Sequence, residues 1–272
     1  MYVASVNALI AAILGVVEGV TEYLPVSSTG HLILVTRWLG LEGDGADSFD
    51  VVIQFGAILA VLVHYRALLW DKARGLVSGR RDSVLLLTAL VLGFVPVAVV
   101  GVLLRKKIKA LLFGPAPVAI ALVAGGVLMM VVESVRKRRR IVGLSGLEHV
   151  TPKRAFLIGL GQCVSLWPGS SRSMCTIVTG QLSGLSTATA AEFSFLLGLP
   201  TLGAATLYEA YKSRNALAGV GVSNVAIGLV VSFVVAWAVI AAFLTYLKRY
   251  GLSPFGLYRI ALGALVFFML VK

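Results

Sequence analysis

Long apolar runs alternate with short polar segments along this chain of 272 residues. A helix needs roughly 20 apolar residues to cross a hydrocarbon core about 30 Å thick. Runs near this length lie at residues 48–65, 83–104, 115–135, 188–211, 220–247 and 253–271. The pattern therefore predicts six membrane-spanning helices.

Four further apolar segments are too short or too interrupted to be simple spans, at residues 4–23, 27–39, 152–167 and 171–183. They form two pairs, each broken by a proline and a cluster of hydroxyl residues, LPVSST at 24–29 and WPGSSRS at 167–173. Proline ends a helix at or before the preceding residue. Irregular backbone at membrane depth persists only where it is buried in protein or lines a wet cavity. We therefore expect two re-entrant helix pairs.

Composition supports an all-α polytopic membrane protein. Hydrophobic residues make up 58% of the chain and charged residues 13%, with a mean hydropathy of +0.95, which is outside the range of an ordinary soluble domain. The net charge of +12 would suit a nucleic-acid partner, but the basic residues cluster in short loops between the predicted spans. This is the distribution that the positive-inside rule expects, so we predict membrane lipids and no nucleic acid as partners.

The two re-entrant pairs resemble each other in sequence. Setting Pro25 on Pro168 aligns PVSSTGHLILV with PGSSRSMCTIV. The chain then divides into residues 1–140, with a re-entrant pair at 4–39 and three spans, and residues 141–272, with a pair at 152–183 and three spans. An odd number of spans makes the halves insert in opposite orientations, so we predict one membrane domain built as an inverted repeat. The alternative is chance similarity between two Pro-Ser-Ser stretches.

The distribution of Lys and Arg predicts how the chain is oriented. Alternate loops at 66–82, 136–154 and 248–252 hold five, seven and two basic residues, against four at 105–114 and two at 212–219. The richer set is expected to face the cytoplasm. Both termini and the entry side of the first re-entrant pair then face outward.

The first break carries an unusual set of polar residues for an apolar segment. Glu18 and Glu22 are four residues apart, so both carboxylates lie on one face of a helix, and a buried acidic pair requires a cation or a basic partner. Single hydroxyls in membrane helices usually bond to the helix backbone, but Ser27, Ser28 and Thr29 follow a proline. At least one of them is expected to bind a ligand or act as a nucleophile. His31 lies within reach of Ser28 if a helix begins there, either as a packing residue or as an acid–base group.

The second break supplies a cation. Arg172 is a guanidinium within an apolar half-chain and requires an anion, either Glu18 or Glu22 or a phosphate oxygen. It opens a helix, whose free N–H groups favour anions. Hydroxyl residues crowd around it, at Ser170, Ser171, Ser173 and Thr176. Carboxylates, hydroxyls, histidine and arginine together suit phosphoryl transfer, in which positioning and charge neutralisation carry most of the catalysis.

These motifs resemble a known family. EGVTEYLPVSSTGH at 18–31 and PGSSRSMCT at 168–176, together with FDVVIQFGAILAV at 49–61 and EFSFLLGLP at 192–200, are similar to the bacterial undecaprenyl-diphosphatases, also called bacitracin-resistance proteins. The similarity runs essentially from end to end. It implies hydrolysis of undecaprenyl diphosphate to undecaprenyl phosphate and inorganic phosphate, which recycles the lipid carrier of peptidoglycan synthesis. It also implies six spans with two re-entrant pairs in the inner membrane and an active site open to the periplasm.

The resemblance also implies residue roles. Ser28 is the nucleophile, whereas Glu18, Glu22 and His31 serve metal binding and proton transfer. A divalent cation, Mg²⁺ or Ca²⁺, is expected at the Glu18–Glu22 pair. The residues expected to bind the diphosphate are Arg172, Ser171, Ser173, Thr176, Ser27 and Thr29. The chain departs from many members of the family at Met174 and Cys175, which replace small residues and are expected to narrow the space beside Arg172.

Two other functions fit parts of the sequence. SSTGH is similar to an element of the acid-phosphatase-like lipid phosphatases, but their KxxxxxxRP stretch and a histidine after Arg172 do not occur in this chain. A polyprenyl-phosphate transporter or flippase has the same kind of inverted repeat, but it does not need so many reactive groups. Small-xxx-small patterns at 15–19 and 180–184 permit close helix approach. We interpret them as packing within the re-entrant pairs, and a homodimer remains an alternative.

Overall fold

The computed structural model describes residues 6–41, 43–247 and 249–270. The predicted limits at residues 4 and 271, and the basic residue 248, lie outside these ranges. Helices account for nearly all of the described chain: α1 (Ala8–Thr21), α2 (Ser28–Trp38), α3 (Asp44–His64), α4 (Arg66–Val77), α5 (Arg81–Leu112), α6 (Pro115–Arg138), η1 (Leu147–His149), α7 (Pro152–Gln162), η2 (Cys163–Leu166), α8 (Arg172–Leu182), α9 (Thr187–Lys212), α10 (Arg214–Val220), α11 (Val222–Leu247) and α12 (Ser253–Leu270).

The predicted polytopic all-α fold is confirmed. Within the described residues, five helices are long and apolar enough to cross a membrane, namely α5, α6, α9, α11 and α12. The α3–α4 pair, bent by 72° at Tyr65, provides a sixth candidate. The helices of the two breaks are shorter, with 14 residues in α1 and 11 each in α2, α7 and α8. At 1.5 Å per residue they extend only about 17–21 Å, too little to span the bilayer.

Three segments predicted as loops contain helix. α5 continues to Leu112, so the expected loop at 105–114 was wrong over most of its length. The basic residues there are good helix formers and allow the helix to continue beyond its apolar part. α4 and α10 likewise occupy parts of 66–82 and 212–219.

The order of elements recurs along the chain. α1 to α6 form a short pair, a long helix, a short helix and two long helices, and α7 to α12 repeat this order. The N-caps Asn7 and Thr151 lie 144 positions apart, and so do the N-caps Ser27 and Ser171. The alignment of Pro25 with Pro168 was therefore wrong by one residue, because the helix starts rather than the prolines correspond. Opposite insertion of the two halves stays a prediction.

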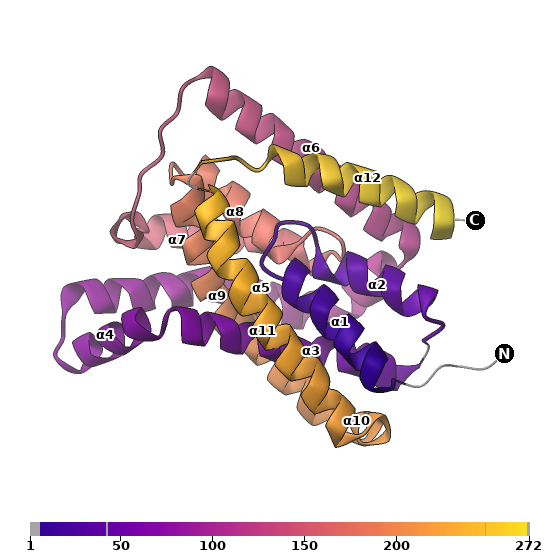
Figure 1. The fold of residues 1–272 in the computed structure, drawn as a ribbon. Coiled ribbons are helices and arrows are strands. Elements are labelled where there is room, and N and C mark those ends of the chain that lie inside the picture. The colour runs from indigo at the N-terminus through magenta and orange to yellow at the C-terminus, as the bar shows by residue number, and fades with distance from the viewer. Residues whose placement is uncertain (1–5, 42, 248, 271–272) are drawn as a thin grey trace.

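The two halves interlock rather than lie side by side. α1 packs on α11 of the second half, and α7 packs on α5 of the first half. α3 contacts α9, and α6 lies alongside α12 (Figure 1). Each re-entrant pair is thus held by a long helix from the other half of the chain.

The glycines of the first small-xxx-small pattern are used for this interlocking. A Cβ atom at Gly15 would lie 2.8 Å from the carbonyl oxygen of Gly228, and one at Gly19 would lie 2.8 Å from that of Ser232. Both carbonyls belong to α11. The interpretation as packing within the re-entrant pair was therefore wrong, since these glycines let α1 approach α11. In the second small-xxx-small pattern, a Cβ atom at Gly180 would lie 2.7 Å from the Cβ atom of Ala190 in α9.

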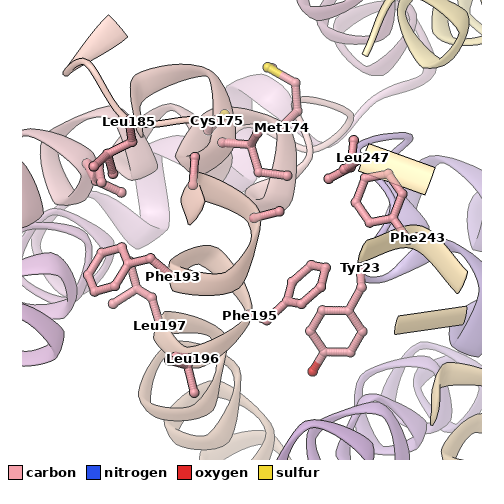
Figure 2. Close-up of a cluster of buried hydrophobic side chains, with 14 of the residues drawn as sticks. Tyr23, Met174, Cys175, Leu185, Phe193, Phe195, Leu196, Leu197, Phe243 and Leu247 are labelled. Atoms are coloured by element: carbon pink, nitrogen blue, oxygen red, sulfur yellow. The ribbon is translucent and has the colours of Figure 1, made fainter. Parts of the chain in front are cut away.

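A buried aromatic and aliphatic cluster lies beside the two breaks (Figure 2). Tyr23 packs edge-on against Phe195 with ring centroids 5.0 Å apart, and its hydroxyl donates to the Ala57 carbonyl at 3.0 Å. Met174 and Cys175 are part of the same cluster. The core therefore fixes the start of the first break and the helix that follows the second break.

Candidate active site

The two breaks form two tips that end in the same way, the first tip at residues 22–27 and the second at 167–171. Ser27 (φ 72°) and Ser171 (φ 69°) end them with positive φ angles, which are rare for residues with a side chain. Each serine then caps the helix that follows: Ser27 Oγ accepts from Gly30 N at 3.2 Å and Ser171 Oγ from Met174 N at 3.3 Å. The strained turns thus place the first residues of α2 and α8, Ser28 and Arg172, in equivalent positions.

Ser28 and Arg172 meet at one carboxylate. Ser28 Oγ donates to Glu22 Oε2 at 2.6 Å, and Arg172 Nη2 donates to Glu22 Oε1 at 3.0 Å. All three residues are buried. Glu22 therefore holds the serine hydroxyl as a general base would, while the guanidinium balances the carboxylate charge.

The second half of the chain orients Arg172. Its Nη1 donates to the Ser194 carbonyl at 2.8 Å and to Ser194 Oγ at 3.1 Å. The guanidinium carbon lies 5.4 Å from the centroid of the Tyr23 ring. The anion that Arg172 contacts in the structure is the carboxylate of Glu22. The Nε atom of Arg172 has no hydrogen-bond partner in the described part of the chain.

A cavity of about 160 Å³ lies between the two tips. Pockets for drug-sized molecules usually measure about 300–1,000 Å³, so this one suits a small polar headgroup rather than a long lipid chain. Six residues predicted for the site line it: Glu22, Ser27, Ser28, Thr29, Ser171 and Arg172. Met174 and Cys175 do not line it, so the expected narrowing beside Arg172 was wrong, because both side chains pack into the core instead.

Glu18 lies behind the cavity on α1 and is fully buried. Neither of its carboxylate oxygens has a hydrogen-bond partner among the described residues. The charged groups that act on it are Glu22, Asp50 and Arg172. Because Glu22 is itself an acceptor, the two carboxyl groups bond to each other only if one of them is protonated.

His31 faces α12 rather than the cavity. Its Nδ1 lies 2.8 Å from the Ser27 carbonyl oxygen, and its Nε2 lies 2.6 Å from the hydroxyl of Tyr258. The carbonyl can only accept, so Nδ1 carries the proton and Nε2 accepts from the tyrosine. The His31 and Tyr258 rings stack at an interplanar angle of 6°. His31 thus holds the strained carbonyl that precedes Ser28.

Ser173 and Thr176 support the site from behind. Ser173 Oγ donates to the Leu24 carbonyl at 2.8 Å, which joins α8 to the first tip. Thr176 Oγ1 lies 2.7 Å from Ser194 Oγ, next to the bonds that hold Arg172. Neither residue lines the cavity.

Several site residues were not predicted. Gln54, Ser165 and Thr201 add polar groups to the cavity wall, and Ser194 orients Arg172. Gln54 and Ser194 lie within mostly apolar segments quoted for the family resemblance. Their position as polar residues inside predicted spans could have identified Gln54 and Ser194 as site residues.

Carboxylates at the site fit a cation with few protein ligands. The described residues contain no group of three or more His, Cys, Asp and Glu able to hold a metal ion. Glu18 nevertheless has two buried acceptor oxygens beside Glu22. Mg²⁺ is commonly held by one or two carboxylates, with water and substrate phosphates completing its shell, so the Glu18–Glu22 pair fits such an ion.

Fold and site together define a multi-pass membrane protein with a buried serine–carboxylate–arginine site between two re-entrant breaks. The model of one family, the bacitracin resistance protein BacA, matches residues 11–265. The chain belongs to this family.

Curated relatives are similar in sequence to this chain over nearly its whole length. An undecaprenyl-diphosphatase of Sorangium cellulosum is 59% identical over 95% of this chain and 85% of its own length. One from Solidesulfovibrio magneticus is 46% identical over 98% of this chain and 99% of its own. One from Thermoanaerobacter pseudethanolicus is 42% identical over 96% of each chain.

Proposed function

We propose that this protein is an undecaprenyl-diphosphatase, which hydrolyses undecaprenyl diphosphate to undecaprenyl phosphate and inorganic phosphate. The observation that carries the proposal is the Ser28–Glu22–Arg172 arrangement at a cavity of headgroup size. The curated relatives bear the same name at 42–59% identity. In bacteria this reaction recycles the lipid carrier of peptidoglycan synthesis, which accounts for bacitracin resistance.

In the proposed reaction, Ser28 Oγ attacks the terminal phosphorus and its proton passes to Glu22 Oε2, 2.6 Å away. The bond between that phosphorus and the bridging oxygen breaks, and undecaprenyl phosphate leaves. Water then cleaves the phosphoserine to release inorganic phosphate. Arg172 and the N–H groups that open α8 stabilise the charge on the phosphate oxygens. The competing version is direct attack by water, with Glu22 as the base.

A divalent cation, Mg²⁺ or Ca²⁺, is proposed at Glu18 and Glu22. When bound, it would neutralise the charge on the diphosphate oxygens. Glu18 supplies the free oxygens, whereas Glu22 is shared with Ser28 and Arg172. Removal of the cation is therefore expected to abolish turnover.

We propose the bacterial inner membrane as the location, with the site open to the periplasm. In Figure 1 the basic α4 region and the α6–α7 connection lie to the left, while the start of α1 and the end of α12 lie to the right. This separation supports a cytoplasmic left side under the positive-inside rule. The start of α1 and the end of α12 then face the periplasm.

Release of phosphate from undecaprenyl diphosphate by the purified protein in detergent, with and without a chelator, tests the function. Glu22→Gln, Ser28→Ala and Arg172→Lys are each expected to lose at least about 100-fold in kcat. A lysine is a poor substitute because it cannot bond to Glu22 and Ser194 in one planar fork. Glu133→Gln is the matched control, since Glu133 is a buried carboxylate that caps α12 away from the cavity.

No release by well-folded wild-type protein would instead favour the polyprenyl-phosphate transporter. Acid quenching during turnover separates the two chemical routes, because phosphate trapped on Ser28 requires covalent attack. Full turnover by Ser28→Ala would exclude that route.

A further inference from the structure

Arg259 of α12 is a fully buried cation away from the serine–carboxylate–arginine site. Its guanidinium takes part in no ion pair within the described residues, and its Nε has no hydrogen-bond partner there. It does not line the cavity between the tips. Burying a guanidinium without a carboxylate partner is costly. The groups that accept hydrogen bonds from Arg259 therefore indicate the role of its side chain.

Those partners are backbone carbonyls from three places. Nη1 donates to Pro25 O at 3.3 Å, which lies in the first tip, and Nη2 donates to Gly169 O at 2.9 Å, in the second tip. Nη2 also donates to Ala121 O of α6 at 3.1 Å. One rigid fork from outside both tips thus joins the first tip, the second tip and a membrane-spanning helix.

The surrounding backbone makes room for this fork. A Cβ atom at Gly125 of α6 would lie 2.3 Å from Arg259 Nη2, and one at Gly126 would lie 2.6 Å from the carbonyl oxygen of Gly256. α6 and α12 therefore cross closely, with a gap at Gly125 through which the arginine reaches the tips. Gly169 has a φ of 94°, and a Cβ there would lie 2.6 Å from Val118 O, so it brings its carbonyl close to α6.

Two of the carbonyls that Arg259 binds, those of Pro25 and Gly169, are close in sequence to the reacting groups. Pro25 lies three residues before Ser28 and Gly169 three residues before Arg172. The positions of Ser28 and Arg172 relative to each other depend on how the two tips are aligned, since both reach Glu22. A neutral side chain such as glutamine could donate to one or two of these carbonyls. The planar guanidinium donates to all three.

We propose that Arg259 is a positioning residue that aligns the two tips, so that Ser28 and Arg172 face one phosphorus atom. This rests on the proposed phosphatase function for its kinetic consequence, but the alignment itself is a property of the fold. It predicts that loss of the fork lowers kcat and loosens both tips, while the lipid substrate still binds.

The test compares Arg259→Gln and Arg259→Lys with Arg136→Gln. Arg136 is the matched control because it also bonds to two backbone carbonyls, those of Gln181 and Leu185, at a different place in the fold. We measure kcat and KM for phosphate release and, independently, hydrogen–deuterium exchange of peptides covering residues 22–30 and 166–174. Misplacement by about 1 Å can cost about 100-fold in rate. Both Arg259 variants are expected to lose about that much in kcat, with KM changed less than about threefold.

Exchange is expected to rise in both tips for the Arg259 variants, and only around residues 181–187 for Arg136→Gln. Unchanged exchange at the tips, or a kcat equal to that of wild type or of Arg136→Gln, overturns the proposal. If wild-type protein releases no phosphate, the proposed function fails while the exchange result still decides the alignment.

A second variant pair applies if the Arg259 variants fail to fold. Gly125→Ala keeps Arg259 but crowds its guanidinium and the end of the flexible Met174 side chain. Gly263→Ala crowds the same helix crossing at Val123 and Ala119 without contact with either. Gly125→Ala is expected to lower kcat and raise exchange at the tips. Equal behaviour of the two variants overturns the proposal.

Discussion

Ser27 and Ser171 show how a local conformation positions chemistry. Each has a positive φ, a conformation that costs of the order of 1–3 kcal/mol for a residue with a side chain. Each recovers part of this cost by capping the helix that follows. The turn makes the next residue the first of its helix, and those residues are Ser28 and Arg172.

Substitutions at Ser27 should separate strain from capping. Ser27→Ala keeps the strain and loses the cap, so it is expected to destabilise the protein by about 1 kcal/mol or more. Ser27→Gly loses the cap but relieves the strain, so its cost should be smaller. Denaturant unfolding in detergent measures both, and an equal loss in the two variants would contradict this account.

The sequence identified the chemical groups of the site better than their positions. Glu22 and Arg172 were predicted from the cost of a charge in an apolar segment, and Ser28 was singled out among the three hydroxyl residues by the family resemblance. The structure brings these three residues together. His31 was expected beside the nucleophile, but it faces Tyr258, which lies 227 positions further along the chain. Its proton-transfer role stays a prediction. Such a partner cannot be read from local spacing, because it depends on how α12 packs.

Among the helices, α1 depends on small residues for its place. Gly15 and Gly19 bring it within contact of the α11 backbone, which positions Glu18 and Glu22 at the end of the helix. The pattern of glycines was visible in the sequence. The identity of the helix that packs against them, α11, could not be predicted, because a face of small residues does not specify its partner.

Alanine at two helical glycines should have opposite effects. At Gly19 the new Cβ would lie 2.8 Å from a backbone oxygen of α11, and we expect a loss of about 1–3 kcal/mol from overpacking. At Gly203 of α9 it would meet no atom within 4 Å. Ala there should be neutral or stabilise by up to about 1 kcal/mol through helix propensity. Unfolding of both variants in detergent checks this, and destabilisation of equal size would refute it.

The molecule as a whole is built from two halves that exchange their re-entrant helices. The sequence predicted two similar halves but not the contacts of α1 with α11 and of α7 with α5. These contacts join positions that are far apart in the chain, and no local pattern encodes them. The one-residue error in aligning the halves has a local origin, since Pro25 lies two residues before its N-cap Ser27 whereas Pro168 lies three residues before its N-cap Ser171.

Separate expression of residues 1–140 and 141–272 tests the interlocking. Each half would expose the surface that the other covers, so neither is expected to fold alone. Coexpression should restore a complex that copurifies and has measurable phosphatase activity. A stable, well-folded single half would show that the exchanged contacts are dispensable.

The ion pair between Glu22 and Arg172 has a consequence for selectivity. In the resting site an internal carboxylate occupies the guanidinium, so an incoming lipid headgroup must compete with it. A diphosphate brings more charge to this competition than a monophosphate. We therefore expect the reaction product to be the weaker competitor, so that Glu22 binds Arg172 again as the product leaves, which would favour turnover over product inhibition.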